Sequence, residues 1–179
     1  MSGTERPARI ELMDALRGLA VCLMVLHHFL YDLCEFLGAP WWLFTNPVFD
    51  VLHYFFAGLF IFLSGISSDF SRSNLKRGAK AMALALGITL VTYFMDMTIV
   101  FGVLHLLGVS MMLYPVYKKL PTQALAAVGV VLVVTGYLIS GTVVEAKFLF
   151  PFGFVYEGFT SSDFFPILPH LGWYMLGTV

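Results

Sequence analysis

Long apolar runs dominate this sequence. They cover residues 15–37, 47–66, 79–95, 100–117 and 122–140, and a sixth run begins near Asp163. A hydrocarbon core of about 30 Å is crossed by a helix of about 20 apolar residues. Open sheet edges and irregular backbone cannot face lipid. The runs therefore predict an all-α integral membrane protein, a polytopic helical bundle of about six transmembrane helices.

The composition agrees with a membrane protein. Hydrophobic residues make up 59% of the 179 residues and charged residues 12%, whereas soluble domains average about 25% charged residues. The formal net charge of −1 lacks the positive excess of a nucleic-acid binder, so we expect no nucleic-acid partner. The sixth run is still apolar at Val179, and we expect the C-terminal helices to be missing. Without repeats or a change in composition, residues 1–179 are interpreted as a single transmembrane domain.

The basic residues predict an orientation. Nine of the ten lie at the start of the chain or in and beside alternate loops: Arg6, Arg9, Arg17, Arg72, Lys76, Arg77, Lys80, Lys118 and Lys119. Loops rich in Lys and Arg stay on the cytoplasmic side, so the N-terminus is expected there. Lys147 lies on the opposite side, in a segment rich in aromatic residues that favours an interfacial or re-entrant stretch over a seventh span.

Polar side chains recur along one face of the first run. Seven residues recur at intervals of three, four and seven, which places them along one face of a helix. They are Asp14, Arg17, Met24, His28, Tyr31, Asp32 and Glu35, all polar except Met24. Ionisable groups at membrane depth are costly and usually functional. Adjacent residues on a helix point about 100° apart, so only one of His27 and His28 can share the face of Arg17, and we select His28.

The other histidines gather towards the predicted outer half of the membrane. Asp50 and His53 lie three residues apart in the second run, while His105 and His170 follow in later runs. With Asp32, Asp96 and Asp163, they predict a polar chamber open to the outside. Alternatively, each histidine forms an interhelical hydrogen bond that only stabilises the bundle.

Arg17 has two interpretations. It is either a topology anchor paired with Asp14 or a ligand for an anionic cofactor that arrives from the cytoplasm. The basic loops of the same side offer further cations for phosphate groups or for anionic lipid headgroups. Since the chain has no Walker loop, dinucleotide glycine pattern, Cys-x-x-Cys or His-Glu-x-x-His motif, nucleotide hydrolysis and a metal site are not expected.

Five stretches resemble a known family. They read RIELMDALRGLA at 9–20, MVLHHFLYD at 24–32, FIFLSGIS at 60–67, FGVLHLLG at 101–108 and SDFFPILP at 162–169. These resemble bacterial membrane proteins related to heparan-α-glucosaminide N-acetyltransferase, within the wider transmembrane acyltransferase superfamily. That superfamily has an Arg, ten residues and a His in its first helix, which fits Arg17 and His28.

Two departures from the family pattern concern the site. The family continues beyond its sixth helix with further motifs that this chain does not contain. The catalytic histidine proposed for the animal enzyme lies between helices one and two, where residues 38–46 hold no histidine. The role of His28 is therefore carried over from the wider superfamily, with His53 as the alternative.

The resemblance implies acyl transfer across a bacterial inner membrane. Acyl-CoA, most simply acetyl-CoA, is the expected cytoplasmic co-substrate, and a hydroxyl or amine of an outer glycan or lipid-linked sugar is the expected acceptor. The lipid bilayer surrounds the protein, and a second copy is a further partner in a homodimer. The expected residues are His28, Asp32, Asp50 and His53 for catalysis, Arg17, Asp14, Arg72 and Arg77 for the cofactor, and His105, Asp163 and Tyr31 for the substrate.

Two other functions fit the same residues. A proton-coupled transporter or channel could use the outer histidines and carboxylates as a proton relay. A haem protein could take two axial ligands from different helices, chosen among His27, His28, His53 and His105.

Overall fold

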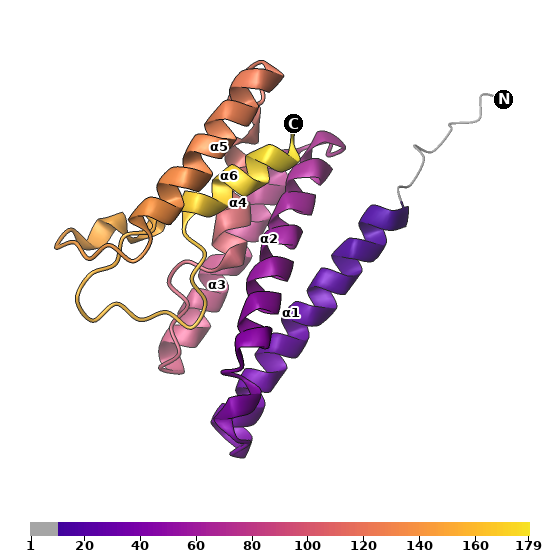
Figure 1. Ribbon diagram of the computed structural model, residues 1–179. Coiled ribbons are helices and arrows are strands. Elements are labelled where there is room, and N and C mark those ends of the chain that lie inside the picture. Colours follow the sequence, from indigo (N-terminus) through magenta and orange to yellow (C-terminus); the bar gives the residue numbers. More distant parts are fainter. Residues whose placement is uncertain (1–10) are drawn as a thin grey trace. The chain divides into compact units, whose positions relative to one another are not determined.

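The structure is a computed structural model that describes residues 11–179 (Figure 1). Its elements are the helices α1 (Glu11–Leu37), α2 (Pro47–Asp69), α3 (Asn74–Phe94), α4 (Val103–Tyr117), α5 (Thr122–Ile139) and α6 (Ile167–Gly177), with the short 3-10 helices η1 (Trp41–Leu43) and η2 (Lys147–Phe152). The described part of the chain has no β-strand, only two isolated bridges. Each predicted apolar run therefore contains one α-helix. Arg6 and Arg9 of the predicted topology lie outside the described residues.

Within residues 11–179, three helices are long and apolar enough to cross a membrane: α1, α2 and α5. Helix α4 is apolar but shorter, and α3 carries Lys76, Arg77 and Lys80 near its start. Helix α6 begins at Ile167 rather than near Asp163, because Pro166 is its extended N-cap residue. The predicted fold class, an all-α integral membrane bundle, is confirmed.

Local sequence signals set the ends of the first helices. Helix α1 stops at Gly38, whose φ of +69° is a left-handed conformation that glycine adopts without a steric penalty. Helix α2 starts at Pro47, and the Asn46 side chain accepts a hydrogen bond from the Val48 backbone N–H at 2.9 Å. Proline in the first turn after an Asn cap is a common helix start.

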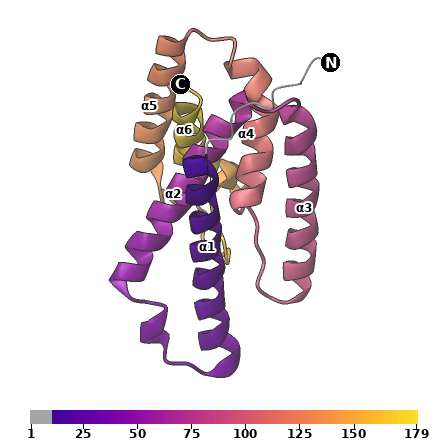
Figure 2. The ribbon, with the colours of Figure 1, turned by 90° about the vertical axis from the view of Figure 1, so that its right-hand side faces the viewer.

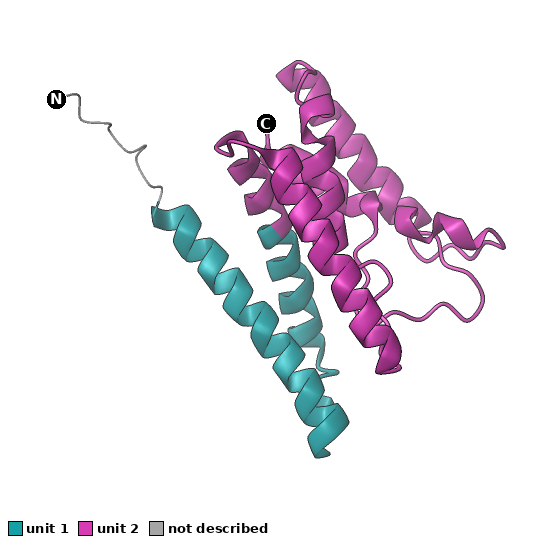
Figure 3. Cartoon of the chain, turned by 180° about the vertical axis from the view of Figure 1, so that it is seen from behind, with its two compact units in different colours: residues 1–60 teal, residues 61–179 magenta. Residues whose placement is uncertain are grey.

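The chain divides into two compact units (Figure 3). The first comprises residues up to Phe60 and includes α1, η1 and the first half of α2. The second, Ile61–Val179, contains the end of α2 and the helices α3 to α6. Each unit is described by itself below. The interpretation of residues 1–179 as one domain stays a prediction.

Close helix pairs build the second unit. Helix α3 packs along α4 and helix α5 along α6, as Figures 1 and 2 show. A Cβ added at Gly78 of α3 would lie 2.8 Å from the Gly108 carbonyl oxygen of α4, and one at Gly172 of α6 would lie 2.6 Å from the Gly129 carbonyl oxygen of α5. Small residues allow such close backbone approach between membrane helices.

Candidate functional site

A pocket opens between α1 and α2 within the first unit. Its lining consists of Leu23, Met24, Leu26 and His27 from α1 and of Phe49, Leu52, His53, Phe56 and Ala57 from α2. Aliphatic, aromatic and thioether groups therefore form most of the wall, and two imidazoles form its polar part. Within each helix, the lining residues are related by spacings of three and four, and residues spaced in this way lie on one face of a helix.

The imidazoles of the pocket are stacked on each other. The ring centroids of His27 and His53 lie 3.9 Å apart, with 23° between the ring planes. Phe44, which follows η1, contacts the His27 ring at 4.8 Å. The pair therefore joins the two helices through ring contacts, with the His27 ring held between Phe44 and His53.

Two of the other predicted catalytic residues, Asp50 and His28, interact electrostatically with both His27 and His53. The His28 ring meets the His27 ring edge-on at 5.9 Å, but His28 is absent from the pocket lining. Asp32 is exposed. The structure thus brings His53, Asp50, His28 and the unselected His27 into one group.

Two further predicted residues lie elsewhere on α1. The Arg17 guanidinium forms an ion pair with the Asp14 carboxylate at 3.5 Å, as the topology-anchor interpretation requires. Arg17 precedes His28 by eleven residues, which is about 16 Å along a helix. The Tyr31 ring packs edge-on against Phe44 at 5.3 Å. Arg17 is therefore about three turns away from the imidazoles along α1.

In the second unit, the His105 side chain forms hydrogen bonds at the start of α4. The His105 Nδ1 atom accepts a hydrogen bond from the Gly102 N–H at 3.2 Å, and its Nε2 atom lies 3.2 Å from the Thr89 hydroxyl. That hydroxyl donates to the Ile99 carbonyl at 2.6 Å, so it accepts the Nε2 proton. Both ring nitrogens of His105 therefore have protein partners in its neutral form.

Asp163 acts at the same helix end. Its Oδ2 atom accepts a hydrogen bond from the Val103 N–H at 3.1 Å. The first N–H groups of a helix have no partner within the helix, and a carboxylate there is also favoured by the helix dipole. Two of the three predicted substrate residues, His105 and Asp163, thus lie together at the α4 N-terminus, where both make structural hydrogen bonds.

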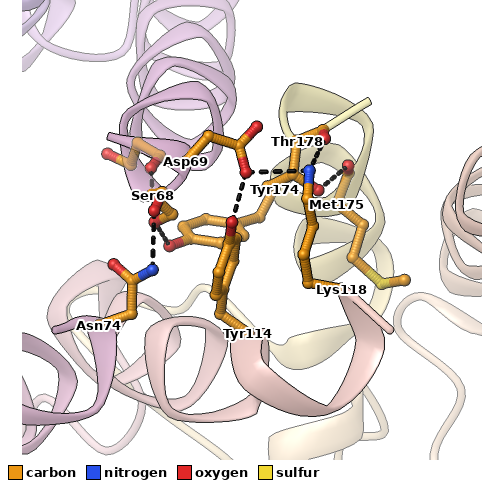
Figure 4. Close-up of polar contacts among 9 residues, drawn as sticks. Ser68, Asp69, Asn74, Tyr114, Lys118, Tyr174, Met175 and Thr178 are labelled. Atoms are coloured by element: carbon orange, nitrogen blue, oxygen red, sulfur yellow. Dashed lines mark hydrogen bonds and ion pairs between the residues drawn. The ribbon is translucent and has the colours of Figure 1, made fainter. Parts of the chain in front are cut away.

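A polar network joins the helix ends at the side of the basic loops (Figure 4). The Lys118 ammonium lies 2.9 Å from the Asp69 carboxylate and donates to the Thr178 carbonyl at 2.8 Å. The Tyr114 hydroxyl donates to Asp69, and the Ser68 and Tyr174 hydroxyls share a hydrogen bond. This network connects the ends of α2, α4 and α6 in the second unit.

Several buried polar atoms near this network have no protein partner. Among the described residues these include Asn74 Oδ1 and the Tyr117 hydroxyl, on side chains that are 6% and 8% exposed. Arg72 and Arg77, the predicted cofactor residues of the following loop and helix, are exposed. The end of the second unit beside the basic loops therefore combines exposed cations with buried polar atoms that lack a protein partner. Such atoms usually form hydrogen bonds with water or with a ligand.

Sequence reasoning missed several of these residues. His27 was not predicted as a site residue, because its neighbour His28 was assigned to the helical face of Arg17. Lys118 was interpreted only as a marker of topology. Asp69 carried a usable signal, since it is a carboxylate between an apolar run and a basic loop. Ser68 and Tyr174 carried none, because a hydroxyl in an apolar run does not reveal its partner.

The geometry of the imidazole pair bears on the haem alternative. Axial haem ligands point a nitrogen at the iron from opposite sides, whereas His27 and His53 stack face to face at 3.9 Å. These two rings are therefore not arranged as axial ligands of one iron. Within residues 11–179, no group of three His, Cys, Asp or Glu side chains is placed to hold a metal ion.

The apolar helices of membrane length define an integral membrane protein of the polytopic helical class. The family model described as "Heparan-alpha-glucosaminide N-acetyltransferase, catalytic" matches residues 9–179. The chain belongs to this family, and its activity is of the membrane acetyltransferase type. Among curated proteins and solved structures, none matches the chain significantly.

Proposed function

We propose that this protein transfers an acetyl group from cytoplasmic acetyl-CoA to a sugar on the opposite side of the membrane. The single observation that carries the proposal is the stacked pair of His27 and His53 beside an apolar pocket. An imidazole can take up and return a proton near neutral pH. A mostly apolar pocket next to it limits the access of water to a thioester.

His53 is the proposed general base. Asp50 precedes it by three residues on α2 and interacts electrostatically with both imidazoles, which favours the imidazolium formed during the reaction. His27 stacks on the His53 ring and restricts its orientation. His28 and Asp32 are the alternative base and orienting group, on the face of α1 that includes Arg17.

The proposed step conserves atoms and charge. His53 removes a proton from the acceptor hydroxyl or amine while the acceptor oxygen or nitrogen attacks the thioester carbonyl carbon. A C–O or C–N bond forms, the C–S bond breaks, and its electron pair leaves with the CoA sulfur. The proton then passes from His53 to the CoA thiolate, and general acid–base catalysis of this kind contributes about 10²- to 10⁴-fold in rate.

The proposed binding residues for acetyl-CoA are basic. Arg17, with Asp14 as its ion-pair partner, and the exposed Arg72 and Arg77 are suited to CoA phosphates because guanidinium groups bind phosphate in a bidentate manner. The positive-inside pattern predicts a cytoplasmic location for all three cations. Tyr31, His105 and Asp163 remain the proposed acceptor residues, and the last two also cap α4.

The family description supports a glucosaminide as the proposed acceptor. A terminal α-glucosaminide carries a free amine and several hydroxyls, and either group can attack a thioester. Methyl α-D-glucosaminide is therefore a suitable probe. A bacterial inner membrane with a cytoplasmic N-terminus is the proposed location, and a homodimer is the proposed assembly.

The experiment uses the purified protein in lipid nanodiscs with radiolabelled acetyl-CoA and methyl α-D-glucosaminide. We expect His53→Gln to lower kcat by about 10²- to 10⁴-fold while acetyl-CoA binding by calorimetry persists. Val51→Ala, an exposed position on the same helix, is the matched control. A loss with His28→Gln but not with His53→Gln would transfer the role of base to His28. Absence of transfer by the wild type, together with proton flux in liposomes, would support the transport alternative instead.

A further inference from the structure

The pocket between α1 and α2 matches only one part of the two proposed substrates. This inference rests on the proposed function. No Lys or Arg lines the pocket, so the phosphates of CoA have no counter-charge there. A sugar needs many hydrogen-bond partners, but the lining offers only the two imidazoles. A short apolar group attached to a carbonyl fits both the apolar walls and the polar edge.

The pocket is small. Its volume is about 40 Å³, whereas a cavity of about 150 Å³ is needed to hold benzene, and one water needs about 10–15 Å³. About three water-sized groups can therefore enter, which corresponds to the methyl and carbonyl groups of an acetyl unit. A four-carbon acyl chain would have to extend out of this space.

Leu23 and Ala57 line the pocket about one helical turn from the imidazoles. Leu23 precedes His27 by four residues on α1, and Ala57 follows His53 by four residues on α2. Because α1 and the first half of α2 run antiparallel (Figure 1), both side chains lie on the same side of the imidazole pair, about 6 Å along the helix axes. Ala57 is 1% exposed, and Leu23 is half-buried.

We propose that this pocket receives the acyl group during transfer and that Leu23 and Ala57 limit its length to two or three carbons. The thioester carbonyl then lies beside the imidazoles, with the methyl group against Leu23 and Ala57. One methylene in a hydrophobic pocket changes specificity by about 10- to 200-fold. The sizes of the Leu23 and Ala57 side chains thus determine which acyl-CoA is the preferred donor.

The test compares acetyl-, propionyl-, butyryl- and hexanoyl-CoA with methyl α-D-glucosaminide as the acceptor. We expect the wild-type kcat/KM to fall at least about tenfold from acetyl to butyryl. Leu23→Ala and Ala57→Gly enlarge the pocket from opposite helices, so each should lower that ratio about tenfold or more. Ala57→Val fills the pocket and should reduce transfer of every acyl group.

Gly58→Ala is the matched control. It adds one methyl group beside Ala57, but that methyl has no atom within 4 Å and Gly58 does not line the pocket. Its acyl preference should equal that of the wild type. A wild type that uses hexanoyl-CoA as well as acetyl-CoA, or enlarged variants with an unchanged ratio, would overturn this inference and leave the proposed function intact. Failure of the wild type to transfer any acyl group would overturn both.

Discussion

At the scale of single residues, the histidines of this chain have different surroundings. His27 and His53 stack beside a pocket, whereas both ring nitrogens of His105 have hydrogen-bond partners at the start of α4. The Nδ1 atom of His170 likewise lies 2.8 Å from the Pro166 carbonyl. A group whose nitrogens are already used must break a structural hydrogen bond before it can bind a substrate.

The two hydrogen bonds of the His105 ring predict that replacing this residue lowers the stability of the protein. Replacement by Ala leaves the buried Gly102 N–H without its partner, so we expect a loss of about 0.5–2 kcal/mol in the free energy of unfolding, as for other helix caps. Thermal unfolding in detergent measures it, with the exposed Tyr93→Phe on α3 as the control. Full stability of His105→Ala combined with a raised KM for the acceptor would instead establish the predicted substrate role.

At the scale of helices, backbone contact through glycine determines which elements pair. The Gly129 and Gly172 contact lets α5 and α6 approach closely, and Gly78 and Gly108 do the same for α3 and α4. Packing of this kind is specific because membrane helices gain little from hydrophobic burial against one another. Each pair contributes one helix to the polar network, Lys118 following α4 and Tyr174 lying on α6.

A methyl group at one of these contacts should separate the helices. A Cβ at position 172 lies 2.6 Å from a backbone oxygen, so Gly172→Ala requires the backbone to move. We expect a destabilisation of about 1–3 kcal/mol, measured as a lower melting temperature. Gly87→Ala is the comparison, because a Cβ at Gly87 meets nothing within 4 Å. Equal melting temperatures for the two variants would show that α5 and α6 do not pack through Gly172.

At the scale of the whole molecule, the basic residues and the apolar helices together imply an orientation. Lys118 and Lys119 lie after α4, whereas Glu145 lies in the segment between α5 and α6. One membrane-spanning helix, α5, separates these two places in the chain. They should therefore face opposite sides of the bilayer.

Cysteine labelling tests this orientation. In a background in which Cys22 and Cys34 are replaced by Ala, single cysteines at the exposed positions Lys119 and Glu145 should react with a membrane-impermeant maleimide from opposite sides of sealed vesicles. Cytoplasmic labelling of Lys119→Cys agrees with the positive-inside prediction. Labelling of both positions from one side would mean that α5 does not cross the bilayer.

The sequence by itself determined the helices, their number and most of their ends. Apolar runs of membrane length, Pro47 after Asn46, and Gly38 act locally, and a bilayer excludes irregular backbone and open sheet edges from contact with lipid. It also placed Asp50 and His53 on one face, because a spacing of three residues is a property of a single helix. The family resemblance came from linear motifs as well.

Only the tertiary structure decided which faces meet. One helix specifies the direction of His27 but not the neighbour that it contacts, so the stack on His53 and the pocket beside it were not predictable. The Lys118, Asp69 and Thr178 network joins residues as far as 109 positions apart. Helix periodicity carries no information about such pairs, because they depend on the packing of helices that are distant in sequence.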